Sequence, residues 1–113
     1  MSEKKIEEII SMLTLEEKIA MIHGNGLFRT EGVKRFNIPP LKMSDGPIGV
    51  RNEFLDDSWI PIGNSDDYVT YLPCSLALAS TWNTELAYKS GQVLGSEARG
   101  RGKDVILGPE IGR

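Results

Sequence analysis

The sequence has very little of several residue types that mark particular classes of protein. It contains one cysteine, Cys74, so no disulfide can form within the chain and a disulfide-stabilised scaffold is excluded. Cys74 follows Leu72-Pro73 in an apolar stretch, which predicts a buried and inert thiol. The one histidine, His23, has no second ligand residue at a metal-binding spacing. We therefore expect neither a metal site nor a cofactor.

Long apolar runs and clusters of positive charge are missing as well. No stretch approaches the roughly 20 apolar residues of a membrane-spanning helix, and the first residues contain no apolar signal core. The formal net charge is −3, from 13 Lys and Arg against 16 Asp and Glu. These features predict that neither nucleic acid nor a membrane is a partner, and they make the cytoplasm the expected location.

Two helices are predicted at the start of a chain whose 113 residues have room for one small domain at most. Residues 3–12 carry isoleucines at helical spacing. Thr14 begins the second helix with a capping box that Glu17 completes, and Gly24-Asn25-Gly26 ends it. The expected buried stripe of the second helix consists of Leu15, Ile19 and Ile22.

The stretch from Leu41 to Arg51 is the most informative. Leu41 and Met43 alternate with polar residues after two prolines, which predicts a short strand. Asp45-Gly46-Pro47 then ends the strand in a turn. Side chains at the carboxyl ends of strands contact ligands in barrels and open α/β sheets. Asp45 is therefore a candidate ligand contact, and the alternative is that it only caps the turn.

The second half of the sequence predicts a helix followed by a second strand. Asn83 is the expected N-cap of the helix. The apolar run 104–107 suits a parallel strand that is buried on both sides. Gly91 and Gly95 lower helix propensity, so we expect them to mark points of close approach to the sheet. The fold class is thus α/β, with two N-terminal helices followed by one βαβ unit.

Several motifs, in the correct order along most of the chain, resemble the glycoside hydrolase family 3 enzymes of the β-glucosidase type. The first-strand signature of that family is similar to Pro40–Pro47 followed by Gly49-Val50-Arg51. The other matching stretches are Leu13–Ile19, Leu72-Pro73, Ala77–Asn83, Gly95–Arg99 and Val105–Pro109. The sequence departs from the family at Ile48, where a histidine is frequent, and in an ending that is shorter than the usual continuation.

This resemblance implies a (β/α)8 barrel of the TIM type. Closing such a barrel takes eight strands and typically about 250 residues. The predicted βαβ unit would supply only the first two strands, so the barrel is incomplete. Residues 1–113 are accordingly interpreted as the truncated N-terminal portion of a family 3 barrel domain.

The resemblance also implies retaining hydrolysis of β-glycosides, in which a carboxylate nucleophile and a carboxylic acid stand about 5 Å apart. Both catalytic residues of the family lie downstream, so we expect no catalytic residue here and no activity of the chain alone. Asp45 matches the family's aspartate that binds sugar hydroxyls. Arg51 matches an arginine of the same motif, with ligand contact and an ion pair supporting the turn as its two possible roles. Arg113 is a candidate for a further family arginine.

Residues 52–67 show no sustained periodicity. A structureless connection of this length is typical of a lid, a binding loop or a disordered segment. It follows the strand that carries Asp45, so we expect it to emerge on the same face. Trp59 is a candidate stacking platform for a sugar ring, and the alternative is that it anchors the loop onto the body of the domain. The loop's acids, expected to be solvated, are Asp56, Asp57, Asp66 and Asp67.

Three functions compete on these grounds. The first is a sugar-binding portion of a β-glucosidase-like hydrolase. The second is a non-catalytic fragment that binds carbohydrate or assists barrel assembly, and the third is an inactive truncated remnant. The expected partners are a β-glycoside or oligosaccharide, together with either the missing remainder of the barrel or a second copy of the chain.

Overall fold

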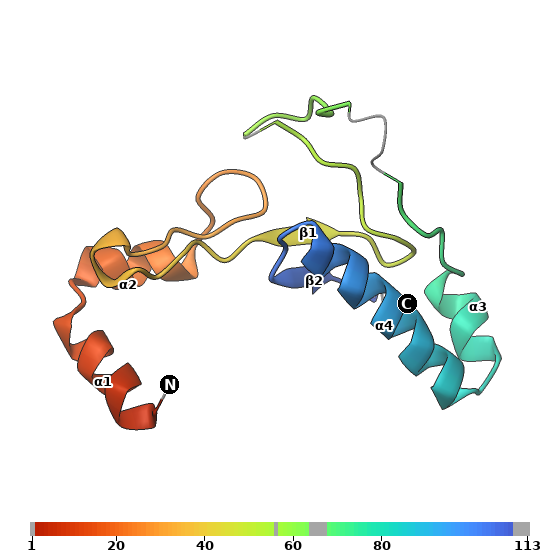
Figure 1. The fold of residues 1–113 in the computed structure, drawn as a ribbon, viewed down its shortest axis with the longest axis horizontal. Coiled ribbons are helices and arrows are strands. Elements are labelled where there is room, and N and C mark those ends of the chain that lie inside the picture. Colours follow the sequence, from red (N-terminus) through yellow and green to blue (C-terminus); the bar gives the residue numbers. More distant parts are fainter. Residues whose placement is uncertain (1, 56, 64–67, 110–113) are drawn as a thin grey trace. The chain divides into compact units, whose positions relative to one another are not determined.

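The computed structural model describes residues 2–55, 57–63 and 68–109. The chain divides into two compact units, Met1–Leu41 and Lys42–Arg113, and each is described by itself (Figure 1). Four residues named above lie outside the described part of the chain, namely Asp56, Asp66, Asp67 and Arg113.

The first unit contains the two predicted helices, α1 (Glu3–Met12) and α2 (Leu15–Ile22). The capping box is confirmed, because the Glu17 amide donates to the Thr14 hydroxyl at 3.2 Å and the Thr14 amide donates to the Glu17 carboxylate at 2.8 Å. A short 3-10 helix, η1 (Lys34–Phe36), follows α2 in this unit.

One arginine joins the three helical elements of the first unit. Arg35 Nε and Nη2 donate to the two carboxylate oxygens of Glu17 at 2.7 and 2.6 Å. Nη2 also donates to the Met12 carbonyl at 2.7 Å, and the guanidinium lies 4.2 Å from the centre of the Phe36 ring. The hydrogen bond from Arg35, followed by that from the Thr14 amide, lowers the pKa of Glu17 to about 2.

The prediction that α2 has a buried apolar stripe is wrong. Its three members are exposed, at 67% for Leu15, 48% for Ile19 and 84% for Ile22. Among the described residues of this unit, the buried apolar side chains are Leu13 and Val33. Periodicity identifies the apolar face of a helix, but it does not reveal whether the same chain supplies a surface to cover that face.

The second unit has the predicted α/β arrangement. Strands β1 (Met43–Asp45) and β2 (Val105–Leu107) pair in parallel, with Asp45 opposite Leu107. The helices α3 (Ser75–Ser80) and α4 (Thr84–Gly100) lie between them in the sequence (Figure 1). The sequence did not predict α3 as a separate helix. Asn83 caps α4 as expected, since its Oδ1 accepts from the amides of Glu85 and Leu86 at 3.0 and 3.1 Å.

A small apolar core connects α4 to the sheet. Its buried members come from the turn after β1, from the segment before α3 and from α4, namely Val50, Leu72, Leu94 and Ala98. Ile106 of β2 packs against this cluster. The prediction that β2 is buried on both sides is wrong, because Leu107 is 45% exposed. Within the described residues β2 has a neighbouring strand on one edge only.

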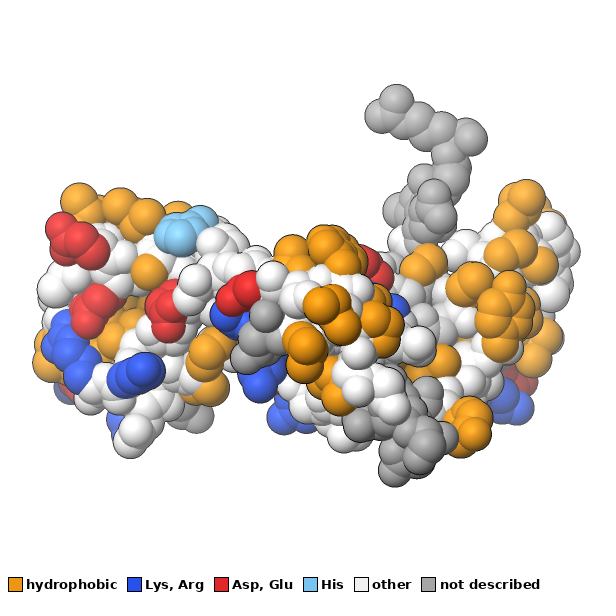
Figure 2. All heavy atoms as spheres, turned by 90° about the horizontal axis from the view of Figure 1, so that it is seen from above, with side chains coloured by type: hydrophobic (Ala, Val, Ile, Leu, Met, Phe, Trp, Pro, Cys, Tyr) orange, Lys and Arg blue, Asp and Glu red, His pale blue; other side chains and the backbone are white. Residues whose placement is uncertain are grey.

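Two other predictions for the second unit are also wrong. The thiol of Cys74 is exposed and not buried. Gly91 and Gly95 do not mark close approaches, since a Cβ added at either position would have no atom within 4 Å. Hydrophobic side chains are plentiful at the surface (Figure 2). Even so, no described helix has both the length and the apolar character to cross a membrane.

We expect acid to weaken the first unit through Glu17. Its pKa is lowered from 4.5 to about 2, so the folded chain binds this proton less readily than the unfolded chain does. The stability contributed by the pair is complete above the unfolded value and is lost as the pH falls through the folded value. The loss is small because both side chains are partly exposed.

Carbon-13 NMR of the Glu17 carboxyl between pH 6 and pH 1.5 measures this directly. The Arg35→Met variant is the matched control, and its Glu17 pKa should move back toward 4.5. Identical titration curves for Glu17 in the two proteins would contradict a role for Arg35.

Candidate functional site

Asp45 is the last residue of β1 and is half-buried at the carboxyl end of the sheet. Its carbonyl oxygen accepts from the Arg51 amide at 3.3 Å and from the Ser44 hydroxyl at 3.0 Å. Within the described part of the chain, no hydrogen bond or ion pair reaches its carboxylate. The side chain therefore does not cap the turn, and the carboxylate can accept hydrogen bonds from a ligand.

The turn after Asp45 depends on two glycines. Gly46 has φ +131°, and a Cβ there would lie 1.8 Å from the Gly49 carbonyl oxygen. Gly49 has φ +149°, and a Cβ there would lie 2.7 Å from the Thr70 carbonyl oxygen. The Leu72 amide also donates to the Ile48 carbonyl at 2.7 Å. The turn is thus closed against the segment that precedes α3, with no room for side chains at the two glycines.

Helix α4 holds that closing segment in place. The Glu97 carboxylate accepts from the Thr70 hydroxyl at 2.6 Å and from the Thr70 amide at 3.1 and 3.2 Å. These bonds, the hydroxyl first, lower the pKa of Glu97. Arg101 Nη2 donates to the Tyr68 carbonyl at 2.9 Å. Composition and periodicity gave no indication of this role for Glu97; only its place in the family-like stretch Gly95–Arg99 singled it out.

A second acid fixes the amino end of the two strands. The Asp104 carboxylate accepts from the Lys42 amide at 3.0 Å and from Arg99 Nη1 at 2.9 Å. In return, the amides of Asp104 and Val105 donate to the Lys42 carbonyl at 2.8 and 3.1 Å. The bond from the Lys42 amide is the main cause of the lowered pKa of Asp104. The register that leaves Asp45 at the carboxyl edge is set by these contacts.

Arg51 and Trp59 lie together, as members of an aromatic cluster. The Arg51 guanidinium carbon is 4.8 Å from the centre of the Phe54 ring and 5.8 Å from that of Trp59. The two rings meet edge to face, with centres 5.7 Å apart and planes at 76°. No ion pair in the described structure joins Arg51 to Asp45. The indole itself is 63% exposed.

The stretch predicted to be structureless contains a small hairpin, which we call the 53–62 hairpin. Phe54 and Pro61 form an antiparallel bridge, and the Leu55 amide donates to the Ile60 carbonyl at 3.0 Å. The Ile62 amide donates to the Glu53 carbonyl, also at 3.0 Å, and closes the base. A strand is recognised in a sequence by apolar and polar residues that alternate with a period of two. This stretch shows no such alternation, so the sequence did not predict the hairpin.

The base of the hairpin is fastened away from Asp45. Lys103 Nζ lies 2.8 Å from the Glu53 carboxylate, and the two side chains are only 15% and 25% exposed. Lys103 precedes the amino end of β2, whereas Asp45 ends β1. That this connection emerges on the face of Asp45 stays a prediction.

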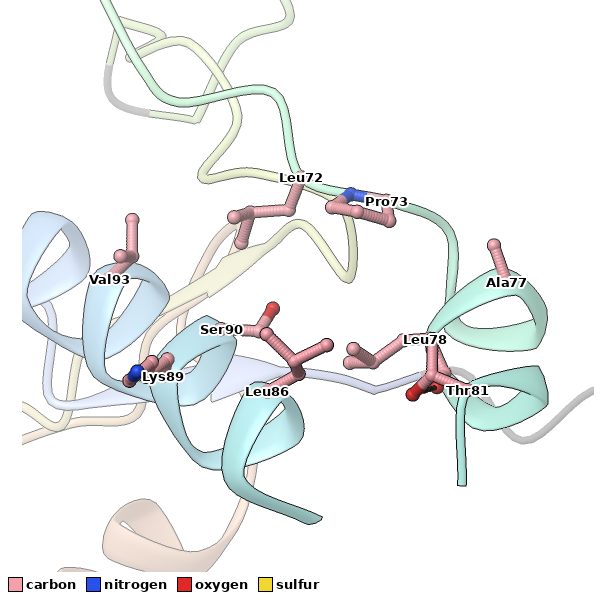
Figure 3. Close-up of a pocket in the computed structure, with 9 residues that line it drawn as sticks. All are labelled: Leu72, Pro73, Ala77, Leu78, Thr81, Leu86, Lys89, Ser90 and Val93. Carbon is pink, nitrogen blue, oxygen red and sulfur yellow. Dashed lines mark hydrogen bonds between the residues drawn. The ribbon is translucent and has the colours of Figure 1, made fainter. Parts of the chain in front are cut away.

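An open groove lies between α3, α4 and the segment before α3 (Figure 3). Leu72, Leu78 and Leu86 project into it from those three parts of the chain. Its volume is about 450 Å³, and Lys89 is the titratable side chain among the residues that line it. Groups of three or more potential metal ligands are absent from the described residues.

Comparison with known proteins finds β-glucosidases among the relatives of this chain. The chain is 41% identical over 109 residues to the β-glucosidase BoGH3A of Bacteroides ovatus. The matched region covers 96% of this chain and 15% of the relative. It is 40% identical over 107 residues to a probable β-glucosidase I of Aspergillus clavatus, covering 94% of this chain and 12% of the relative. No protein-family model matches the chain.

Solved structures give the same result. β-Glucosidase 3B from Thermotoga neapolitana in complex with glucose has a TM-score of 0.75 and 36% identity, covering 93% of this chain and 16% of that one. β-Glucosidase from Kluyveromyces marxianus in complex with glucose has a TM-score of 0.75 and 28% identity. That match covers 92% of this chain and 12% of the Kluyveromyces chain. Sequence and fold together place the relatives of this chain among the glycoside hydrolases. Within that class, the chain is homologous to the family 3 β-glucosidases and corresponds to a small part of their length.

We expect Gly46→Ala to destabilise the second unit by about 1–3 kcal/mol, because the added methyl group collides with the Gly49 carbonyl at an unfavourable φ. Gly91→Ala is the matched control. It adds the same methyl group to α4 where nothing lies within 4 Å, so it should stabilise by up to about 1 kcal/mol. Urea unfolding followed by circular dichroism measures both. Equal stability of the two variants would show that the turn tolerates a side chain.

Proposed function

We propose that this chain is a sugar-binding part of a retaining β-glycosidase of the β-glucosidase kind, and that Asp45 binds hydroxyl groups of the sugar. The observation that carries the proposal is the Asp45 carboxylate, which stands at the carboxyl end of β1 with no hydrogen bond or ion pair from the described residues. The names of the relatives, and the glucose in the solved complexes, support the choice of ligand.

The proposed architecture is a (β/α)8 barrel in which β1 and β2 are the first two strands. Their parallel pairing around α3 and α4 is the arrangement that such a barrel repeats. Residues 1–113 would form the N-terminal portion of that domain, and the other strands would come from outside this sequence. The incomplete core and the half-exposed Leu107 support this view.

An ionised Asp45 would accept two charge-assisted hydrogen bonds from neighbouring hydroxyls, which fixes the orientation of the sugar ring. Retaining hydrolysis also needs a nucleophile and an acid about 5 Å apart, and we assign neither role to a residue of this chain. Trp59 is the proposed stacking surface because most of its indole is exposed. The guanidinium of Arg51 faces two rings, which favours a supporting role over direct ligand contact.

In a complete enzyme that contains this segment, we expect Asp45→Ala to lower kcat/KM by about 10- to 150-fold. That factor corresponds to the roughly 1.5–3 kcal/mol of a hydrogen bond to a charged group. Asp45→Asn should have a smaller effect, because the amide keeps an acceptor but loses the charge. Glu7→Ala, which removes an exposed carboxylate from α1, is the control and should leave kcat/KM unchanged.

An unchanged kcat/KM in folded Asp45→Ala enzyme would remove Asp45 from the site. The 113-residue chain alone should not hydrolyse an aryl β-glucoside, because both catalytic carboxyls are assigned elsewhere. Turnover by the purified chain that Asp45→Ala abolishes would contradict that assignment.

A second candidate function is non-catalytic assembly with further barrel strands or with a second copy. Large apolar side chains in and around α3 and α4 are exposed, at 78% for Leu76, 94% for Trp82 and 68% for Tyr88. Hydrophobic side chains gather over this end of the second unit (Figure 2). A two-stranded sheet with open edges is marginal alone, so such a unit gains stability from a covering partner.

We expect the isolated chain to associate, with an apparent mass in light scattering that rises with concentration. Its thermal unfolding should be broad because the core is small. A monomer at all concentrations with a sharp, reversible transition would show that the unit needs no partner. That result would remove the assembly function.

A further inference from the structure

Arg51 occupies an unusual place between the turn and the 53–62 hairpin. Its backbone amide belongs to the turn, through the 3.3 Å bond to the Asp45 carbonyl. Its side chain belongs to the hairpin, where the guanidinium approaches the rings of Phe54 and Trp59. The Nε and Nη1 atoms are buried, so the contact excludes water from part of the guanidinium. One residue thus connects the turn that carries Asp45 with the hairpin that carries Trp59.

The aromatic cluster has a defined geometry. A guanidinium is attracted to the face of an aromatic ring by the ring quadrupole, within about 6 Å of the centroid. Both distances from Arg51, 4.8 and 5.8 Å, fall in this range. The edge-to-face contact between Phe54 and Trp59 is the arrangement that two rings prefer. Each of the three groups therefore restricts the orientation of the other two.

The backbone alone supplies little to fix this hairpin. Its backbone contacts among the described residues are the bridge between Phe54 and Pro61, the two amide bonds at 3.0 Å, and the bond from the Ser58 amide to the Leu55 carbonyl at 3.1 Å. Two-stranded hairpins are at best marginally stable in water, so side-chain contacts decide their order. The half-buried ion pair of Glu53 with Lys103 fastens the base of the hairpin.

We propose that Arg51 is a positioning residue that fixes the indole of Trp59 through its stacking between the hairpin rings. Its importance for sugar binding rests on the proposed function, in which the exposed face of Trp59 stacks on a sugar. Arg51 acts there without touching the ligand, because its guanidinium faces Phe54 and Trp59. A preorganised indole loses less conformational freedom on binding, which strengthens the contact.

The test measures the motion of Trp59 and needs no sugar. Trp82→Phe leaves Trp59 as the single tryptophan, because the sequence has two. Time-resolved fluorescence anisotropy at micromolar concentration then reports local motion of the indole. Arg51→Met should raise the mobile fraction about two- to fivefold, the factor expected from losing an exposed cation–π contact. Circular dichroism checks that the variant remains folded.

Arg35→Met is the matched control. It removes another guanidinium that lies over a ring, 4.2 Å from the centre of Phe36 in the first unit. The anisotropy of Trp59 should not respond to it. Arg51→Lys keeps the charge but loses the planar guanidinium, so it should give an intermediate mobile fraction. A mobile fraction that is unchanged in folded Arg51→Met would overturn the proposal.

A second variant keeps the proposal testable if Arg51→Met unfolds. Phe54→Leu removes the ring that contacts both partners, and it should mobilise Trp59 to a similar extent. In the double variant the two effects should not add, because both break the same cluster. Additive effects, or an unaltered Trp59 in Phe54→Leu, would show that the cluster does not order the indole.

A separate titration with methyl β-D-glucoside tests the sugar contact. The fluorescence emission of Trp59 is the readout. The parent should respond, and Arg51→Met should need several-fold more glucoside for half its response. No response in the parent would overturn the sugar contact of Trp59, while the anisotropy result would still decide whether Arg51 positions the ring. The two failures are thus distinguishable.

Discussion

The close approach of the backbone at Gly46 is the constraint on which the second unit depends. A side chain at this position would occupy the space of the Gly49 carbonyl, so the chain can leave β1 only through glycine. The resulting turn buries Val50 at 1% exposure beside Leu72, and it delivers Arg51 to the hairpin. The conformation that glycine permits at position 46 thus places the small core, the candidate ligand contact Asp45 and the aromatic cluster.

Three carboxylates of the described structure accept hydrogen bonds from backbone amides and support the fold. Glu97 binds the Thr70 amide, Asp104 binds the Lys42 amide, and Glu17 completes a helix cap. Each of these carboxylates has a lowered pKa because hydrogen bonds favour its ionised form. Asp45 differs from these acids in that no such donor in the described structure reaches its carboxylate. The contrast separates Asp45 from the acids that hold the fold together.

Local chemistry made much of the fold predictable from the sequence. The capping box at Thr14, the cap at Asn83 and the parallel pairing of the two strands are all confirmed. The errors concern burial, at Ile22 and Cys74, because burial depends on what covers a surface. Arg51 and Trp59 were singled out separately, but their contact through Phe54 could not be foreseen from a stretch without periodicity. The cytoplasmic location and the sugar contacts stay predictions.

The contact between Asp104 and Lys42 has a consequence for residues at the opposite end of the strands. Successive side chains of a strand point to opposite faces, so a slip of one position would exchange the environments of Ser44 and Asp45. Ser44 is completely buried, and a carboxylate in its place would lose its hydration without gaining a partner. The carboxylate at Asp104 thereby excludes a misregistered sheet in which the carboxylate of Asp45 would be hidden inside the protein.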